Sequence, residues 1–273
     1  MAEFKKANQR AAEGMASIPS IQQMIEQGGD PQHSIYVHAL NLMSFFGEEV
    51  LTLPPAHKIN DFYCKWLKTY TPNLPPISPI SKSYFFCWVY LDAAFGGERE
   101  TVGTCFVALQ DRLSLHPGQI KAVVNLNQSR MGIYEVLGGD GCLYRLRELI
   151  TDKQLTAHIY SGYRGRAGEI IYIRLVPPLI NSEEHWIGLT TPYLLVRQSE
   201  EDWLRYFARQ EIIPQTVGVE TRLYRHMKDG KDRTYWSEYA FYGYCNYGPG
   251  VIVLTGFPDQ PETQPAHVKY RGR

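Results

Sequence analysis

One stretch of the sequence combines aromatic rings, positive charge and glycine. Residues 158–166 read His-Ile-Tyr-Ser-Gly-Tyr-Arg-Gly-Arg. Tyr160 and Tyr163 could stack on a flat ring, and Arg164 and Arg166 could contact a carboxylate or a phosphate. Two glycines favour an exposed loop. The stretch therefore predicts a binding loop, with an ordinary solvated hairpin tip as the alternative.

A second stretch, residues 222–233, carries five basic side chains against two acidic ones. His226 would share one face of a helix with some of them, and aromatic residues follow directly. The candidate binding residues here are Arg222, Arg225, Arg233, Tyr235 and Trp236. The surface would suit an acidic partner. The alternative is a charged helix face over an aromatic core, with Glu238 paired to Arg225 or Arg233.

Familiar catalytic and metal-binding motifs are absent from the sequence. It has no His-Glu-x-x-His, no P-loop, no Gly-x-Ser-x-Gly and no Cys-x-x-Cys, and its eight histidines are scattered. We therefore predict no metal and no cofactor. If the chain is an enzyme, such as a metal-dependent nuclease or another hydrolase, its site must assemble only in the fold. The candidates would then be Glu238, His226 and Asp140.

The elements expected to position these residues change in type near Met131. Apolar spacing and prolines predict helices before that point, at about residues 18–27, 35–51, 55–67, 81–95, 100–113 and 117–130. Short alternating segments then predict strands at 132–137, 142–150, 154–160, 169–176 and 185–195. Asp140-Gly141 is a typical hairpin turn. Five strands at this spacing predict a small antiparallel β-barrel of SH3-like or OB-like type.

The sequence pattern of residues 198–273 predicts helices, one strand and a loose tail. Ser199 would cap a helix, since Asp202 follows three residues later. Residues 235–244 fit a helix or a strand, and the glycines that follow favour the helix. Residues 251–254 predict a buried strand, and the tail starts near Asp259. The chain is thus expected to be α+β, with a helical domain at 1–130, the barrel at 131–197 and a C-terminal α/β extension at 198–273.

Several segments resemble parts of uncharacterised bacterial proteins that contain a small β-barrel. The similar segments in the barrel region are residues 132–136, 146–149, 168–171 and 174–177. Tyr235-Trp236-x-Glu238-Tyr239 and residues 254–259 resemble other bacterial proteins of this kind. The resemblance implies a bacterial origin and supports the barrel. It implies no activity and transfers no catalytic residue.

Charge and apolar patterning narrow the function classes. The 28 basic side chains balance the 28 acidic ones, which disfavours a protein that coats nucleic acid or anionic membrane over its whole surface. The start of the sequence has no signal-like apolar stretch, and the five cysteines are odd in number and scattered, which predicts a cytoplasmic protein. The favoured function is a non-enzymatic binding or scaffold protein that recognises a protein partner. Nucleic acid is the second choice of partner, a hydrolase is the alternative, and the oligomeric state stays open.

Overall fold

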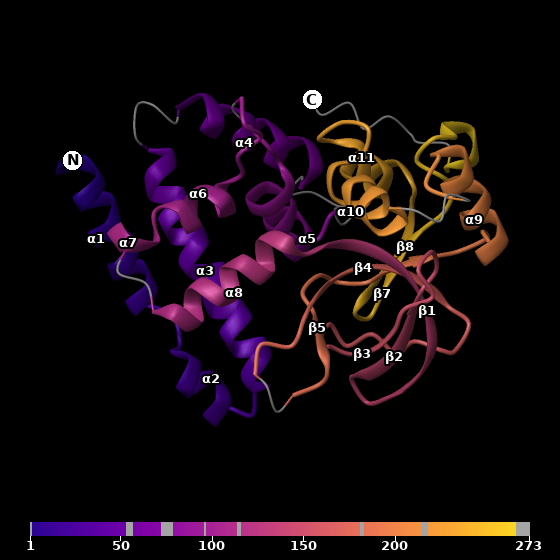
Figure 1. Cartoon of the computed structure of the whole chain (residues 1–273), viewed down its shortest axis with the longest axis horizontal. Coiled ribbons are helices and arrows are strands. Elements are labelled where there is room, and N and C mark those ends of the chain that lie inside the picture. The colour runs from indigo at the N-terminus through magenta and orange to yellow at the C-terminus, as the bar shows by residue number, and fades with distance from the viewer. Residues whose placement is uncertain are drawn as a thin grey trace. The chain divides into compact units, whose positions relative to one another are not determined.

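The computed structural model describes residues 2–52, 57–71, 79–95, 97–113, 116–180, 183–213 and 218–265. The chain forms two compact units (Figure 1). Unit 1 comprises Met1–Thr69, Phe86–Ser129 and Pro177–Glu183. Unit 2 comprises Tyr70–Phe85, Arg130–Val176 and Glu184–Arg273. Helices dominate unit 1 and a closed barrel lies in unit 2, so the α+β prediction with a helical N-terminal part is confirmed.

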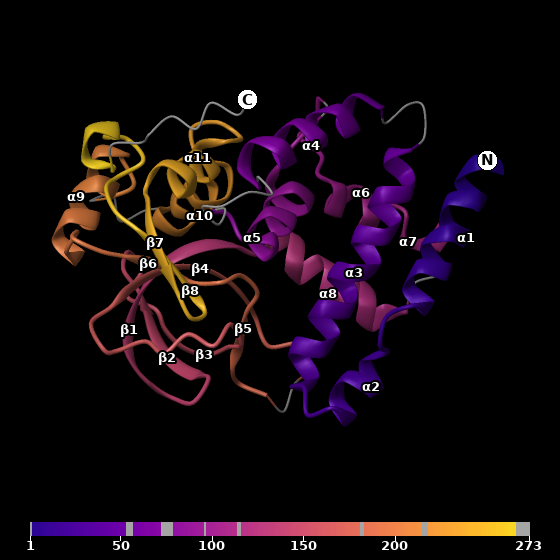
Figure 2. The same cartoon turned by 180° about the vertical axis from the view of Figure 1, so that it is seen from behind.

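Unit 1 is built around one long, central helix, α3 (Pro31–Leu51) (Figure 2). It packs against α1 (Ala2–Ala16), α2 (Ile21–Glu26), α6 (Val102–Ala108) and α8 (Pro117–Gln128). Asp30 caps α3, because its carboxylate accepts a hydrogen bond from the backbone N–H of His33 at 2.8 Å. The other helices of this part are α4 (His57–Tyr70), α5 (Lys82–Cys87, which spans the junction with unit 2), the π-helical η2 (Trp88–Asp92) and α7 (Gln110–Leu113).

Two features of these helices differ from the prediction. Helix α2 begins three residues later than the predicted segment 18–27, because Ser20 caps it in a reciprocal capping box with Gln23. Helix α1 was not predicted, because its buried face is made of alanines such as Ala7 and Ala11 instead of large apolar side chains. Among the described residues, none of the helices combines the length and apolar character that crossing a membrane requires.

The barrel of unit 2 is made of β1 (Arg130–Asp140), β2 (Leu143–Glu148), β3 (Gln154–Ile159), β4 (Ile170–Val176) and β5 (Trp186–Gly188). It closes in the order β1-β2-β3-β5-β4 and back to β1. Four of the five pairings are antiparallel, and β3–β5 is parallel. A closed ring of five strands cannot alternate direction all the way round, so at least one parallel pair is required. The predicted barrel is confirmed, with mixed pairing.

The sheet continues beyond the barrel from one half of β4. There β4 pairs with β6 (Tyr193–Leu195), β6 pairs with β8 (Val251–Leu254), and β8 pairs with the outer strand β7 (Tyr244–Gly248). Strand β8 is where the sequence predicts it. Strand β7 was not predicted, because its side chains are mostly exposed and carry no apolar alternation.

Three helices complete unit 2: α9 (Glu200–Arg209), α10 (Val219–Asp229) and α11 (Tyr235–Tyr242). The capping box of Ser199 and Asp202 starts α9 as predicted. Residues 235–242 form the helix that the sequence favours over a strand. The chain from Asp259 to Pro265 is no loose tail, because Asp259 is held by Arg209 and a short 3-10 turn, η3 (Pro261–Thr263), follows. The rest of the predicted tail, 266–273, lies outside the described residues.

Candidate functional site

The loop that joins β3 to β4 is fixed from beneath by tyrosines. Tyr163 is buried, with only 4% of its surface exposed, and its ring lies 5.3 Å from that of Tyr144, centroid to centroid. The Tyr144 hydroxyl donates to the backbone carbonyl of Tyr163 at 2.6 Å. The Tyr163 hydroxyl donates to the Glu169 carboxylate, also at 2.6 Å. The prediction that Tyr163 is an exposed stacking platform is therefore wrong, because its ring fills the barrel end.

The same loop is held at two further points. The Ser161 hydroxyl donates to the carbonyl of Gly250, at the β7–β8 turn, at 2.7 Å. Gly165 lies against the Tyr163 ring, and a β-carbon at this position would overlap that ring. Arg164 and Arg166, on either side of Gly165, are exposed, and Tyr160 is 36% exposed. We call residues 160–166 the arginine loop.

The basic stretch forms α10 and the turn after it. Leu223 and Met227 face the core of unit 2, where α10 packs against β1. Arg225 is exposed, and Arg222 is half-buried. Arg233 is exposed in the turn that follows. We call Arg222 and Arg225 of α10, together with Lys231 and Arg233 of the following turn, the basic face of α10.

The aromatic residues next to this face point inward. Trp236 is only 5% exposed; its ring stacks on Tyr172 of β4 at 5.2 Å, and its indole N–H donates to the carbonyl of His226 at 2.7 Å. Trp236 is thus a core residue and not part of a binding surface. Tyr235 is half-buried. Glu238 is exposed and accepts a hydrogen bond from the Thr234 hydroxyl at 3.3 Å.

His226 belongs to a buried polar cluster between α9, α10 and α11. Its Nε2 lies 2.7 Å from the Tyr206 hydroxyl oxygen, which in turn lies 3.1 Å from the Tyr235 hydroxyl oxygen. Burial, aided by the positive charge of Lys231 and opposed by Asp259, lowers the pKa of His226 to about 4. Burial raises the pKa of Tyr235 to about 12. At neutral pH the cluster is therefore uncharged, with histidine as the one ready proton acceptor.

The three residues considered for a hydrolase do not form one site. Asp140 is exposed at the turn of the β1–β2 hairpin, and Glu238 is exposed on α11. His226 instead faces Tyr206, on α9. Among the described residues no hydrogen bond or ion pair joins the three. A paired acid and base, or a carboxylate metal cage, is not formed by this set.

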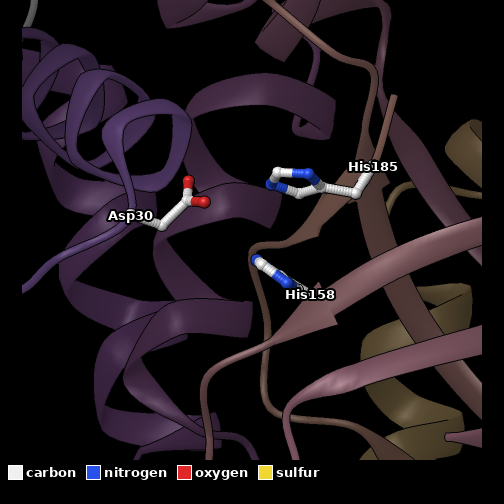
Figure 3. Close-up of side chains that lie close together, drawn as sticks. All are labelled: Asp30, His158 and His185. Atoms are coloured by element: carbon white, nitrogen blue, oxygen red, sulfur yellow. The ribbon is translucent and has the colours of Figure 1, made fainter. Parts of the chain in front are cut away.

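One histidine pair was missed by the sequence reasoning. His158, on β3, and His185, just before β5, have ring centroids 4.1 Å apart, and a nitrogen of each ring lies within 4.8 Å of one of the other (Figure 3). The Nδ1 of His158 lies 2.6 Å from the Tyr160 hydroxyl oxygen. Because side chains alternate between the two faces of a strand, His158 lies on the other face of β3 from the buried Ala157 and Ile159. The sequence could not bring His185 to it, because the parallel β3–β5 pairing is a long-range contact.

Compared with known proteins, the chain matches no family model, no curated protein and no solved structure.

Proposed function

We propose that this protein is a non-enzymatic binding protein that recognises an acidic segment of a protein partner. The recognising residues are the arginine loop, chiefly Arg164, Arg166 and Tyr160, and the basic face of α10. The observation that carries the proposal is the support beneath the loop: Tyr144, Glu169 and Gly250 fix its backbone while both arginines are exposed.

A fixed loop favours recognition because less conformational entropy is lost on binding. The backbone of the arginine loop is already ordered, so a partner has only the two arginine side chains left to immobilise. Arginine presents a rigid fork of N–H donors that matches a carboxylate in a bidentate manner. Exposed arginines on a fixed backbone therefore suit an acidic peptide segment.

A protein partner is favoured over nucleic acid by the charge balance. The chain has zero formal net charge, and the basic excess is confined to short segments. Binding to nucleic acid depends mainly on many phosphate contacts, and it weakens steeply as salt is raised. The few arginines of the arginine loop and of the basic face of α10 provide little of that attraction to phosphates. They are enough to bind a local cluster of carboxylates.

The test is the affinity of the full chain for a fluorescent peptide rich in Asp and Glu, measured by anisotropy. We expect Arg164→Ala with Arg166→Ala to lower the affinity at least about tenfold, since charged hydrogen bonds contribute about 1.5–3 kcal/mol each. The melting temperature should not change, because both side chains are exposed. Arg145→Ala, an exposed arginine on β2, is the matched control and should bind like the wild type.

Three results would contradict the proposal. One is undetectable peptide binding at low salt. Another is equal loss of affinity in the Arg145→Ala control, which would indicate a nonspecific charge effect. The third is tighter binding of a single-stranded oligonucleotide than of the peptide, with affinity falling steeply between 50 and 200 mM salt as phosphate binding requires. That last result would select the nucleic-acid alternative.

A further inference from the structure

We propose that His158 and His185 form a binding site for a divalent first-row transition metal ion of the zinc and copper type. This inference does not rest on the proposed peptide binding, because it uses two histidines that neither the arginines nor the basic face of α10 include. Tyr160, whose hydroxyl oxygen lies next to His158, is the one residue that also belongs to the arginine loop.

The distance between the two imidazoles suits a shared ion. A zinc ion lies 2.0–2.1 Å from each imidazole nitrogen, so tetrahedral geometry brings two such nitrogens to about 3.3–3.4 Å from each other. Here a nitrogen of each ring already lies within 4.8 Å of one of the other, and the ring centroids are 4.1 Å apart (Figure 3). Both side chains are half-buried, so rotation about their χ bonds can supply the remaining movement.

Paired strands carry His158 and directly adjoin His185. Strands β3 and β5 are paired in parallel, with Ala157 opposite Trp186 and His158 opposite Ile187. His185 directly precedes this paired segment. Ala157 and Ile187 are buried in the barrel. A site built on paired strands keeps its ligands in place better than one built on a long loop.

Tyr160 supplies the outer contact that metal-binding histidines usually have. Its hydroxyl oxygen lies 2.6 Å from Nδ1 of His158. In the tautomer whose Nδ1–H donates to Tyr160, the lone pair for a metal is on Nε2. Such an outer hydrogen bond orients the ring and strengthens the ligand, and its loss typically lowers metal affinity 10–100-fold.

Imidazole nitrogens determine the class of ion. They suit zinc, copper and nickel, whereas magnesium and calcium prefer oxygen ligands. Copper binds such sites most tightly in the divalent series, which makes it the most sensitive probe.

The experiment uses the full chain without any partner. Cu²⁺ at one equivalent is followed by electron paramagnetic resonance, in which each coordinated nitrogen splits the signal, and Zn²⁺ affinity is measured by titration calorimetry. We expect a splitting pattern from two nitrogens. His158→Ala and His185→Ala should each leave no more than one of these nitrogens and should weaken Zn²⁺ binding more than tenfold. Tyr160→Phe should keep both nitrogens and weaken Zn²⁺ binding about tenfold.

His116→Asn is the matched control, because His116 is exposed and caps α8, a role that asparagine can fill. Its metal binding should equal that of the wild type. If an alanine variant fails to fold, as judged by circular dichroism, His158→Gln and His185→Gln replace it. The proposal is wrong if wild-type chain shows no saturable 1:1 binding of Zn²⁺, or if the variants at 158 and 185 bind as the control does. Either outcome leaves the peptide measurement unaffected.

Discussion

The Nε2 of His226 lies 2.7 Å from the hydroxyl oxygen of Tyr206, so a histidine from the basic stretch faces the interior of unit 2. Tyr235 extends this contact, with its hydroxyl oxygen 3.1 Å from that of Tyr206. Trp203, Tyr206, Trp236 and Tyr239 are all buried here, and their rings contact one another. The charged face of α10 is thus the outer side of an aromatic core.

The burial of His226 predicts that stability depends on pH. Its pKa is about 4 in the folded chain against 6.5 ordinarily, so the unfolded chain binds the proton first as pH falls. The stabilisation is complete above pH 6.5 and is lost progressively between pH 6.5 and pH 4. At 1.36 kcal/mol per pKa unit the loss approaches about 3 kcal/mol. Urea unfolding at a series of pH values measures it.

His226→Phe is the control for this titration. It removes the titrating ring while the other nearby charges, Lys231 and Asp259, stay in both proteins. The variant should be less stable at pH 7, because Tyr206 loses its partner, but its stability should change less between pH 6.5 and 4. Equal slopes in the two proteins would mean that His226 does not carry the dependence.

The ion pair of Arg209 and Asp259 should stabilise the segment after β8. The guanidinium donates two hydrogen bonds to the carboxylate, at 2.9 and 3.1 Å, and lies over the Phe257 ring at 5.3 Å. In a double-mutant cycle with Arg209→Leu and Asp259→Asn, we expect a coupling energy of about 1 kcal/mol in the free energy of unfolding. Arg209→Lys should recover only part of it, because lysine lacks the planar fork. A coupling near zero would mean that the segment is held by other contacts.

Gly165→Ala should lower the free energy of unfolding, because the added methyl group would meet the Tyr163 ring. A β-carbon at this position would overlap the Tyr163 ring, which is buried and lies 5.3 Å from the Tyr144 ring, centroid to centroid. Forcing an extra methyl group into packed surroundings costs about 1–3 kcal/mol. Gly97→Ala is the control, since nothing lies within 4 Å of its added carbon. Thermal unfolding of both variants compares them, and equal melting temperatures would show that the loop adapts at no cost.

Short sequence motifs predicted the position of an element correctly where a turn or a helix cap has a characteristic residue pair. Asp140-Gly141 predicted the β1–β2 hairpin, and Ser199 with Asp202 predicted the start of α9. Both signals act over two to four residues, so no tertiary information is needed. Strand β7 carries no such signal, because its side chains are mostly exposed and show no apolar alternation. It is held in place by backbone pairing with β8, which the sequence does not reveal.

The direction in which a side chain points was harder to predict than the element that carries it. The sequence placed Tyr163 and Trp236 beside arginines but could not show that the rings turn inward. The Tyr163 ring packs against Gly165 and the Tyr144 ring, and the Trp236 ring stacks on Tyr172 of β4. Both are contacts with partners that only the fold identifies. Exposure of a tyrosine or tryptophan therefore cannot be inferred from its charged neighbours.

The contact of Tyr163 with Glu169 links the stability of the arginine loop to its proposed binding. Tyr163→Phe removes the hydroxyl that donates to the carboxylate at 2.6 Å and keeps the ring that fills the barrel end. We expect a loss of about 1 kcal/mol in the free energy of unfolding, since Glu169 is half-buried and water can replace the donor. The affinity for the acidic peptide should also fall, because the backbone of the flanking arginines is less fixed. Glu169→Gln keeps an acceptor and should bind more tightly than Tyr163→Phe. If Tyr163→Phe binds the peptide as the wild type does, ordering of the loop by this contact does not contribute to recognition.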